Sequence, residues 1–176
     1  MRKNKGFTMI ELLIVIAVIG ILAVAVLAAI NPIEQINRGR DTGSRSDAEQ
    51  LIGGVDRFYA TKGYYPWQSS ADDETNATVM NSMTNTKTLN DTVINELVTS
   101  TGELKEAFRS RIMASDYNTM WLYNRGTQGD STYVCFIPKS KSFLDDANLR
   151  CTTGFPSDFG ADCNGTGGGN FWSCLP

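Results

Sequence analysis

The sequence predicts an α+β protein in which one long N-terminal helix is followed by a small head. Three observations support this fold class. The first is an apolar segment from Phe7 to Ile30, and the second is a helical spacing of apolar residues between Ser44 and Ala60. The third is a pair of strand-like segments within residues 116–138, followed by a cysteine-bearing tail. The head is therefore expected to hold a small antiparallel sheet and a disulfide-bonded C-terminal loop.

The apolar segment is long enough to cross a membrane. Its 24 residues, Phe7 to Ile30, carry a single charge, on Glu11. A helix of this length reaches about 36 Å, against about 30 Å for the hydrocarbon core of a bilayer. Arg2, Lys3 and Lys5 precede it, which predicts a cytoplasmic N-terminus with the rest of the chain outside. An ordinary secretory signal is shorter, but cleavage in residues 23–29 stays open on the sequence alone.

The overall composition argues against an enzyme and against a nucleic-acid groove. The chain has no histidine, and histidine is the commonest general base at neutral pH and the commonest metal ligand. The net charge is −3, and without the first six residues 13 basic residues would face 19 acidic ones, a net charge of −6. Phosphate binding requires clustered basic residues. We expect a non-enzymatic protein with no specific nucleic-acid partner.

Glu11 is the unusual residue of the apolar segment. A carboxylate deep in a bilayer costs on the order of 3 kcal/mol, so an ionisable residue there is by default a functional hypothesis with a partner. The plainer alternative places Glu11 at the level of the lipid headgroups, stabilised by the dipole of the helix N-terminus. Glu11 taken alone does not decide between the two.

The residues around Glu11 resemble a known processing signal. The stretch from Gly6 to Val15, Gly-Phe-Thr-Met-Ile-Glu-Leu-Leu-Ile-Val, is similar to the class III leader junction of type IV prepilins and pseudopilins. The resemblance implies cleavage between Gly6 and Phe7 by a prepilin peptidase and N-methylation of the new Phe7 amine. It also implies that Glu11 pairs with the Phe7 amine of a neighbouring subunit, since two opposite charges attract strongly in a low dielectric. The implied fold is the lollipop of this family, a long helix packed on a small sheet.

The long helix is expected to be interrupted and to continue outside the membrane. Proline removes a backbone donor and clashes with the previous turn, so Pro32 should kink or restart the helix. The resemblance implies that Gly20 and Pro32 give the helix flexibility during assembly. Beyond them, apolar residues from Ser44 to Ala60 define a buried face, with Asp47 among the charged residues placed on the opposite side. Lys62 and Gly63 are expected to end the helix.

These observations give provisional boundaries for the chain. Residues 1–6 are a leader peptide, 7–31 the membrane and filament-core half of the helix, 32–62 its amphipathic half, and 63–176 the head. Within the head we expect an exposed variable loop at 69–101, a short helix from Leu104 to Met113, the sheet within 116–138 and a cysteine-bearing region at 139–176. The two strands are predicted at Asn118–Asn124 and Thr132–Pro138.

Four cysteines lie in the last quarter of the chain, which predicts two disulfides in an exported domain. They are Cys135, Cys151, Cys163 and Cys174. A zinc site is the rival, but the spacings contain no Cys-x-x-Cys pair. Three pairings are open. Short sequential loops close at a lower entropic cost, which weakly favours Cys135 with Cys151 and Cys163 with Cys174.

No cofactor is expected. Some pseudopilins bind calcium in a C-terminal loop, and Asp158 and Asp162 are the first candidates if calcium binds here. No spacing in this region matches a known calcium loop, so a solvated acidic surface is favoured.

The sequence therefore predicts a structural subunit of a type IV pilus. The alternatives within the family are a type II secretion pseudopilin and a minor or competence pilin. A monomeric membrane-anchored binding module and a secreted enzyme are more remote, because neither explains Gly6 and Phe7 together with Glu11. The expected partners are further copies of the chain and other pilins, the prepilin peptidase, and indirectly an assembly platform protein and ATPase. The subunit should first span the cytoplasmic membrane once and then enter an extracellular pilus or periplasmic pseudopilus.

Overall fold

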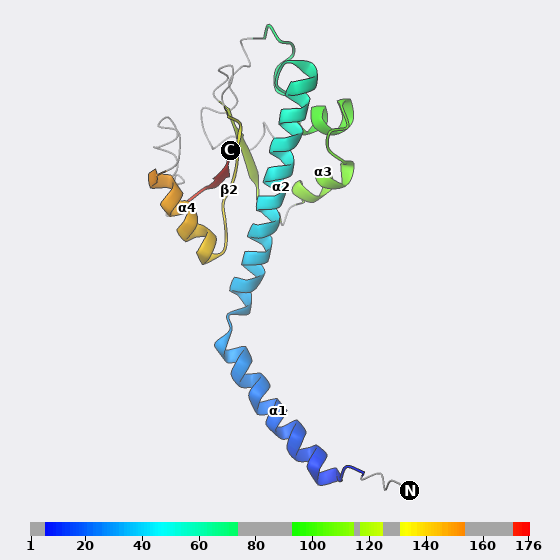
Figure 1. Ribbon diagram of the computed structural model, residues 1–176, viewed down its shortest axis with the longest axis vertical. Helices are drawn as coiled ribbons and strands as arrows, with labels where there is room; N and C mark the ends of the chain where they lie inside the picture. Colours follow the sequence, from blue (N-terminus) through cyan, green and yellow to red (C-terminus); the bar gives the residue numbers. More distant parts are fainter. Residues whose placement is uncertain (1–5, 74–92, 115–116, 125–130, 154–170) are drawn as a thin grey trace. The chain divides into compact units, whose positions relative to one another are not determined.

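The computed structural model describes residues 6–73, 93–114, 117–124, 131–153 and 171–176. The chain divides into two compact units between Ile36 and Asn37, and each unit is described by itself. Figure 1 follows the elements in chain order, from the blue N-terminal helix to the red C-terminal strand. Helices, a three-stranded antiparallel sheet and a disulfide in the C-terminal part confirm the predicted α+β class.

The first unit holds helix α1 (Met9–Ala29) and the beginning of α2 (Pro32–Lys62). The helix stops at Ile30 and restarts at Pro32, as the sequence predicts. Proline suits the first position of a helix because its missing N–H would have no partner there. Asn31 caps the restarted helix: its side-chain oxygen accepts a hydrogen bond from the Glu34 backbone N–H at 3.3 Å.

In the second unit, α2 presents one apolar face to the core. Ala48, Leu51, Val55 and Phe58 are buried at the predicted helical spacing. The helix ends at Lys62, and Gly63 follows with φ of 79°, a left-handed conformation in which its N–H bonds to the Tyr59 carbonyl at 2.8 Å. This is the helix end expected from the sequence, because glycine adopts positive φ without a steric penalty.

The sheet has the order β1-β2-β3 and is antiparallel throughout. Strand β1 (Met120–Tyr123) pairs with β2 (Tyr133–Phe136), and β2 pairs with β3 (Ser173–Leu175). The first two strands lie inside the predicted segments. The third was not predicted from the sequence. Three residues are too short to carry a periodic signal, and this strand forms only by pairing with β2.

The two faces of the sheet belong to two hydrophobic clusters because side chains alternate along a strand. Met120, Leu122, Val134, Phe136 and Leu175 join the core cluster that also contains the buried face of α2. The opposite face carries a second cluster of Trp121, Tyr123, Cys135, Trp172 and Cys174. The sheet is therefore buried on both sides among the residues described.

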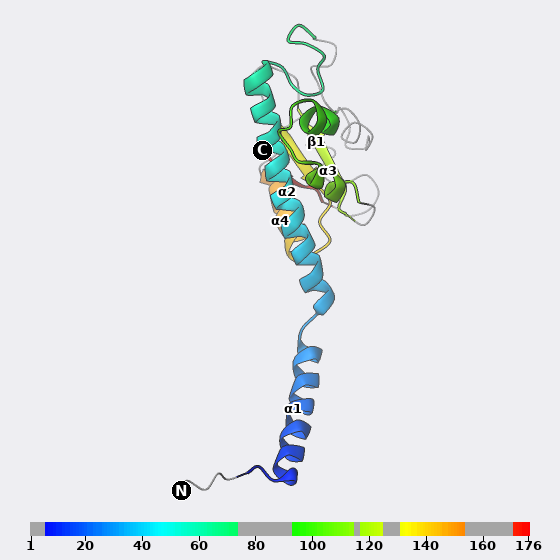
Figure 2. The same cartoon turned by 90° about the vertical axis from the view of Figure 1, so that its right-hand side faces the viewer.

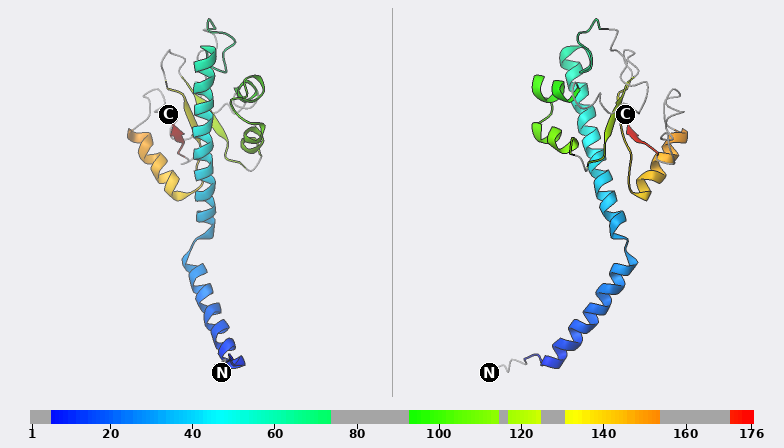
Figure 3. Two further views of the ribbon diagram at one scale, coloured as in Figure 1. Left: turned by 45° about the vertical axis from the view of Figure 1, so that its right-hand side comes forward. Right: turned by 180° about the vertical axis from the view of Figure 1, so that it is seen from behind.

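The remaining helices of the second unit flank α2 and the sheet on opposite sides. The π-helical turn η3 (Glu96–Ser100) and helix α3 (Glu106–Ile112) lie on one side, and α4 (Lys141–Thr153) lies on the other (Figures 1 and 3). Figure 2, turned by 90°, shows the same arrangement, with α3 in front and α4 behind α2. Helix α3 matches the short helix predicted from the sequence, whereas α4 was not predicted.

One part of the segment expected to be an exposed loop is in fact core. Val93, Ile94 and Leu97, which fall within residues 69–101, are fully buried. The polar composition of the whole segment hides this short apolar stripe, which becomes core because it packs with α2 and α3. Residues 74–92 of the same segment lie outside the described residues.

Candidate functional site

The sequence-predicted junction is an extended segment that leads directly into α1. Gly6, Phe7 and Thr8 precede the helix, and the Phe7 side chain is 77% exposed. Thr8 is the N-cap residue, and its hydroxyl oxygen accepts a hydrogen bond from the Glu11 backbone N–H at 3.3 Å. The junction is therefore accessible on its N-terminal side and fixed by a cap on its helical side.

Glu11 completes this cap from inside the first turn. Its Oε2 accepts hydrogen bonds from the Thr8 backbone N–H at 2.9 Å and from the Thr8 hydroxyl at 2.7 Å, which makes a reciprocal capping box. Both bonds go to one oxygen, and within the described part of the chain Oε1 receives none. An ionised carboxylate has about four acceptor positions. Glu11 is thus positioned by its own chain and still has room for a cationic donor.

Apart from Glu11, helix α1 carries apolar side chains around its whole circumference. No residue of α1 is buried, from Met9 to Ala29. Its 21 residues are long and apolar enough to cross a membrane, by length and composition, a criterion that an N-terminal signal sequence also meets. An exposed helix that is hydrophobic all round requires either lipid or other apolar helices around it.

Gly20 lies in the interior of α1, and Pro32 is the first residue of α2. A Cβ built at Gly20 would meet nothing within 4 Å. Pro32 marks the restart of the helix after Asn31. A role for either residue in helix flexibility remains a prediction.

The disulfide pairing preferred from loop lengths is wrong. Cys135 is bonded to Cys174, and Cys151 is also in a disulfide, whereas Cys163 lies outside the described residues. Cys135 on β2 and Cys174 on β3 are directly opposite each other, with their Cα atoms 4.0 Å apart. The larger loop costs only about 0.8 kcal/mol more to close. Strand pairing therefore outweighs loop length.

Among the remaining predicted site residues, Asp158 and Asp162 also lie outside the described residues. Their candidacy for calcium therefore remains a prediction. Within the described part of the chain, no group of three or more His, Cys, Asp or Glu residues is placed to hold a metal ion.

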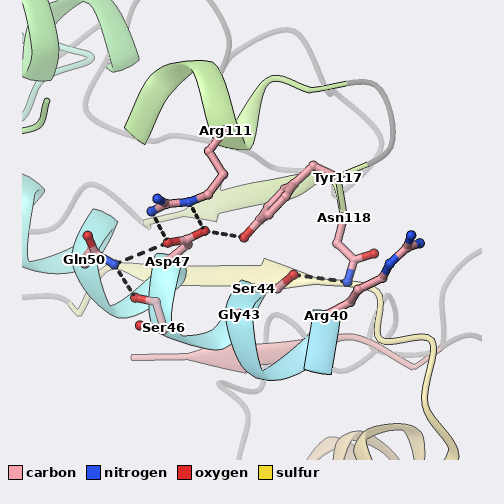
Figure 4. A pocket seen from close by; sticks show the side chains of 9 residues that line it. All are labelled: Arg40, Gly43, Ser44, Ser46, Asp47, Gln50, Arg111, Tyr117 and Asn118. Atoms are coloured by element: carbon pink, nitrogen blue, oxygen red, sulfur yellow. Dashed lines mark hydrogen bonds and ion pairs between the residues drawn. The ribbon is translucent and has the colours of Figure 1, made fainter. Parts of the chain in front are cut away.

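A polar cluster in the head was missed by the sequence reasoning, which placed Asp47 on the solvent side of α2. Asp47 is 4% exposed. Arg111 of α3 donates to its two oxygens, from Nε at 2.9 Å and from Nη2 at 2.5 Å, and the Tyr117 hydroxyl donates a third bond (Figure 4). This bidentate pair raises the pKa of Arg111, and burial together with the bond to Asp47 raises the pKa of Tyr117.

Asp41, six residues before Asp47 on α2, makes a second set of buried hydrogen bonds. Its carboxylate accepts from the backbone N–H groups of Lys139 and Ser140 and from the side-chain amide of Asn118. These bonds tie α2 to the start of α4. Gln50 of the same helix also donates to Asp47, at 3.3 Å. No local pattern marked Asp41 or Asp47 as buried, because their partners outside α2 are between 64 and 99 residues away in sequence.

The fold and the junction together define a class of protein with one uncovered apolar N-terminal helix and a disulfide-bonded α+β head. Residues 1–27 match the family model described as the prokaryotic N-terminal methylation motif. The chain is also 31% identical over 158 residues to the fimbrial protein EcpC of Eikenella corrodens, a match that covers 89% of this chain and 97% of the relative. No solved structure matches the chain. The chain belongs to the type IV pilin family.

Proposed function

We propose that the protein is a structural subunit of a type IV pilus that polymerises through its N-terminal helix. The observation that carries this proposal is the position of Glu11, the single charge of an otherwise apolar helix, in the first turn and three residues after the capping Thr8. A carboxylate held there within a membrane or a helix bundle gains from a cationic partner.

The partner in this proposal is the N-terminal amine of a neighbouring subunit. Cleavage after Gly6 creates a positively charged amine on Phe7, four residues before Glu11. Thr8 of the same chain engages only Oε2 of Glu11, so Oε1 stays open to the amine of a neighbouring subunit. Pairing with the carboxylate of the next subunit would satisfy both charges and fix the axial register between the two. The apolar surface of α1 would pass from lipid contacts to contacts with other helices.

The processing steps and remaining partners follow from the same proposal. A prepilin peptidase removes residues 1–6 and methylates Phe7, which defines the mature chain as residues 7–176. Arg2, Lys3 and Lys5 hold the N-terminus on the cytoplasmic side before cleavage. A separate assembly platform protein and ATPase supply the work of extraction. Gly20 and Pro32 allow the helix to change conformation as it leaves the bilayer.

A pilus is favoured over a type II secretion pseudopilus by the description of the relative. EcpC is described as a fimbrial protein, and its match extends over nearly the whole of both chains, head included. The methylation motif alone does not distinguish the two systems.

The proposal is tested by mass spectrometry of the protein sheared from the surface of the native organism. The expected result is a mature chain that starts at Phe7, carries one added methyl group and is found in the filament fraction. A chain that starts at Met1 in the membrane fraction, or one that starts near Asn31 in the medium, would overturn the proposal.

A further inference from the structure

A polar hollow of about 480 Å³ lies on α2 in the head and is bordered by α3 through Arg111 (Figure 4). Its volume is in the range of about 300 to 1,000 Å³ that is typical of small-molecule sites. Apart from Gly43, the residues that line it all have polar side chains. They are Arg40, Ser44, Ser46, Asp47, Gln50, Arg111, Tyr117 and Asn118. A lining of this kind suits a ligand that is held by hydrogen bonds and charge.

Asn118 brings an unused acceptor to the hollow. The residue is 6% exposed, and its amide nitrogen donates to Asp41 and to the Ser44 hydroxyl, both at 3.1 Å. A carboxylate only accepts hydrogen bonds, so the nitrogen faces Asp41 and Oδ1 is turned away from it, as it is from Ser44 in Figure 4. No residue that the structure describes donates to this Oδ1. A ligand that displaces water from it must therefore supply a donor, because an unsatisfied amide oxygen is costly.

Arg40 carries the unbalanced charge of the hollow. The charged lining residues are two arginines and one aspartate. Arg111 donates to both oxygens of Asp47, and nearby Arg45 pairs with Glu49 at 3.7 Å. Arg40 is exposed and forms no ion pair or side-chain hydrogen bond with the described part of the chain. One positive charge is thus left for a ligand.

Two further groups have unused hydrogen-bonding positions. The Nη1 of Arg111 makes no hydrogen bond to a described residue, because Asp47 takes up only Nε and Nη2. The side-chain nitrogen of Gln50 is engaged by Ser46 and Asp47, whereas its Oε1 accepts from no described residue. The hollow therefore offers cationic donors together with two neutral acceptors.

We propose that this hollow binds a sugar acid, a ring with several hydroxyl groups and one carboxylate. The carboxylate pairs with Arg40 and with the open edge of Arg111, and it balances the one excess positive charge. Hydroxyl groups donate to Asn118 Oδ1 and to Gln50 Oε1. Gly43 leaves room for the ring, since a Cβ there would meet nothing within 4 Å. This binding role goes beyond the proposed pilus function and does not depend on it.

Other anions fit the same groups less well. A phosphate monoester carries about 1.5 to 2 negative charges at pH 7, and only one cation is unbalanced. An amino acid brings an ammonium group, for which the lining offers only Asp47, already engaged on both oxygens. The carboxyl terminus of a peptide requires an apolar recess for its last side chain, and no lining residue is aliphatic.

A ligand-detected NMR titration of the detergent-solubilised full chain tests the ligand class. The probe is D-glucuronate, with D-glucose lacking the carboxylate and acetate lacking the hydroxyl groups. We expect both simpler probes to bind at least about tenfold more weakly, since each loses the charged bond or the neutral ones. Absence of D-glucuronate binding, or equal or tighter binding of D-glucose, acetate or inorganic phosphate, would overturn the assignment.

A charge variant locates the bound carboxylate. Arg40→Gln should weaken D-glucuronate binding about tenfold through loss of the ion pair. Arg45→Gln removes the same charge from the same helix, but Arg45 does not line the hollow. It should change the affinity by less than about twofold. Equal losses from the two variants would show that the general charge of the head attracts the ligand, and the proposed site would be wrong.

A steric variant tests the position of the ring without altering charge. Gly43→Leu should abolish D-glucuronate binding, whereas Gly39→Leu, on the same helix but outside the hollow, should preserve it. A Cβ at either position meets nothing within 4 Å, so both variants should fold, which urea unfolding checks. Unchanged binding by a folded Gly43→Leu chain would place the ligand elsewhere and overturn the proposal. Filament yield enters none of these measurements, so their outcome is separate from that of the pilus proposal.

Discussion

The Asp41 carboxylate of α2 receives both polar hydrogens of Ser140, the residue before α4. Its Oδ2 lies 2.7 Å from the Ser140 backbone nitrogen and 2.6 Å from the Ser140 hydroxyl. Asp41 is fully buried, and two further donors, the Lys139 N–H and the Asn118 side chain, satisfy its other oxygen. A single charged side chain thus fastens the helix to the segment that begins the C-terminal region.

Replacement of this residue should therefore be costly. We expect Asp41→Ala to lower the free energy of unfolding by about 3 kcal/mol, because it leaves buried N–H groups without an acceptor. The measurement is urea unfolding of the detergent-solubilised chain, followed by tryptophan fluorescence. The control is Glu49→Gln, an exposed residue paired loosely with Arg45 at 3.7 Å, which should cost less than about 0.5 kcal/mol. Equal losses from the two variants would contradict the fastening role of Asp41.

Tyr117 should give the head a specific alkaline instability. Burial raises the pKa of this tyrosine in the folded head, whereas the unfolded side chain ionises near pH 10. Above about pH 10 the unfolded state therefore loses this proton before the folded state does, and the free energy of unfolding falls as pH rises. Tyr117→Phe removes this contribution. It should cost about 1 kcal/mol at pH 7, through the lost bond to Asp47, and should flatten the decline above pH 10.

This prediction is measured by urea unfolding at pH 7 and at several values between about 9 and 11. Tyr133→Phe is a suitable comparison, because Tyr133 is also a head tyrosine but does not contact Asp47 among the described residues. An alkaline slope unchanged in Tyr117→Phe would show that this tyrosine does not ionise differently in the two states.

The Cys135–Cys174 bridge should contribute strongly to stability. It closes a loop with a sequence separation of 39, which corresponds to about 4 kcal/mol in the chain-entropy model. We expect the double variant Cys135→Ala, Cys174→Ala to lose stability of that order in urea. Peptide mapping without reduction should recover a fragment that joins the two residues. A fragment that joins Cys135 to Cys151 would contradict the pairing.

Two glycines of α2 should respond in opposite directions to the same substitution. Gly43→Ala should stabilise the head by roughly 0.8 kcal/mol, because alanine favours a helix and has open space there. At Gly54 a Cβ would lie 3.2 Å from the Leu104 Cγ. Gly54→Ala should therefore gain less or lose stability, as Leu104 is displaced from the core. If Gly43→Ala and Gly54→Ala change the free energy of unfolding equally in thermal unfolding, Leu104 does not restrict the side chain at position 54.

Glu11 should affect assembly more than processing. We expect Glu11→Gln to be cleaved after Gly6 yet to enter sheared filaments at least about tenfold less efficiently, since the amide cannot neutralise a neighbouring Phe7 amine. The measurement compares mature chain in the membrane and filament fractions. Glu34→Gln, at the start of α2, is the control and should assemble normally. Normal assembly of Glu11→Gln would contradict the proposed pairing.

The elements that the sequence predicts well are those whose signal is local. The apolar run of α1, the restart at Pro32, the glycine at the end of α2 and the alternation of β1 and β2 each follow from residues that are adjacent or nearly adjacent in sequence. Helix α4 was not predicted, although it is 13 residues long. Its charged and apolar residues give only a weak stripe, and its N-terminus is stabilised by Asp41 from another helix.

The sequence by itself determined the N-terminal junction, the membrane-length helix and the presence of a cysteine-stabilised head, because each depends on residue type and order alone. Only the tertiary structure decided which cysteines pair and which acidic residues of α2 are buried. Strand register places Cys135 opposite Cys174, and the packing of α3 and α4 supplies the donors that make Asp47 and Asp41 stable inside the head. A buried charge depends on its partners, and these partners are distant in sequence and adjacent only in the fold.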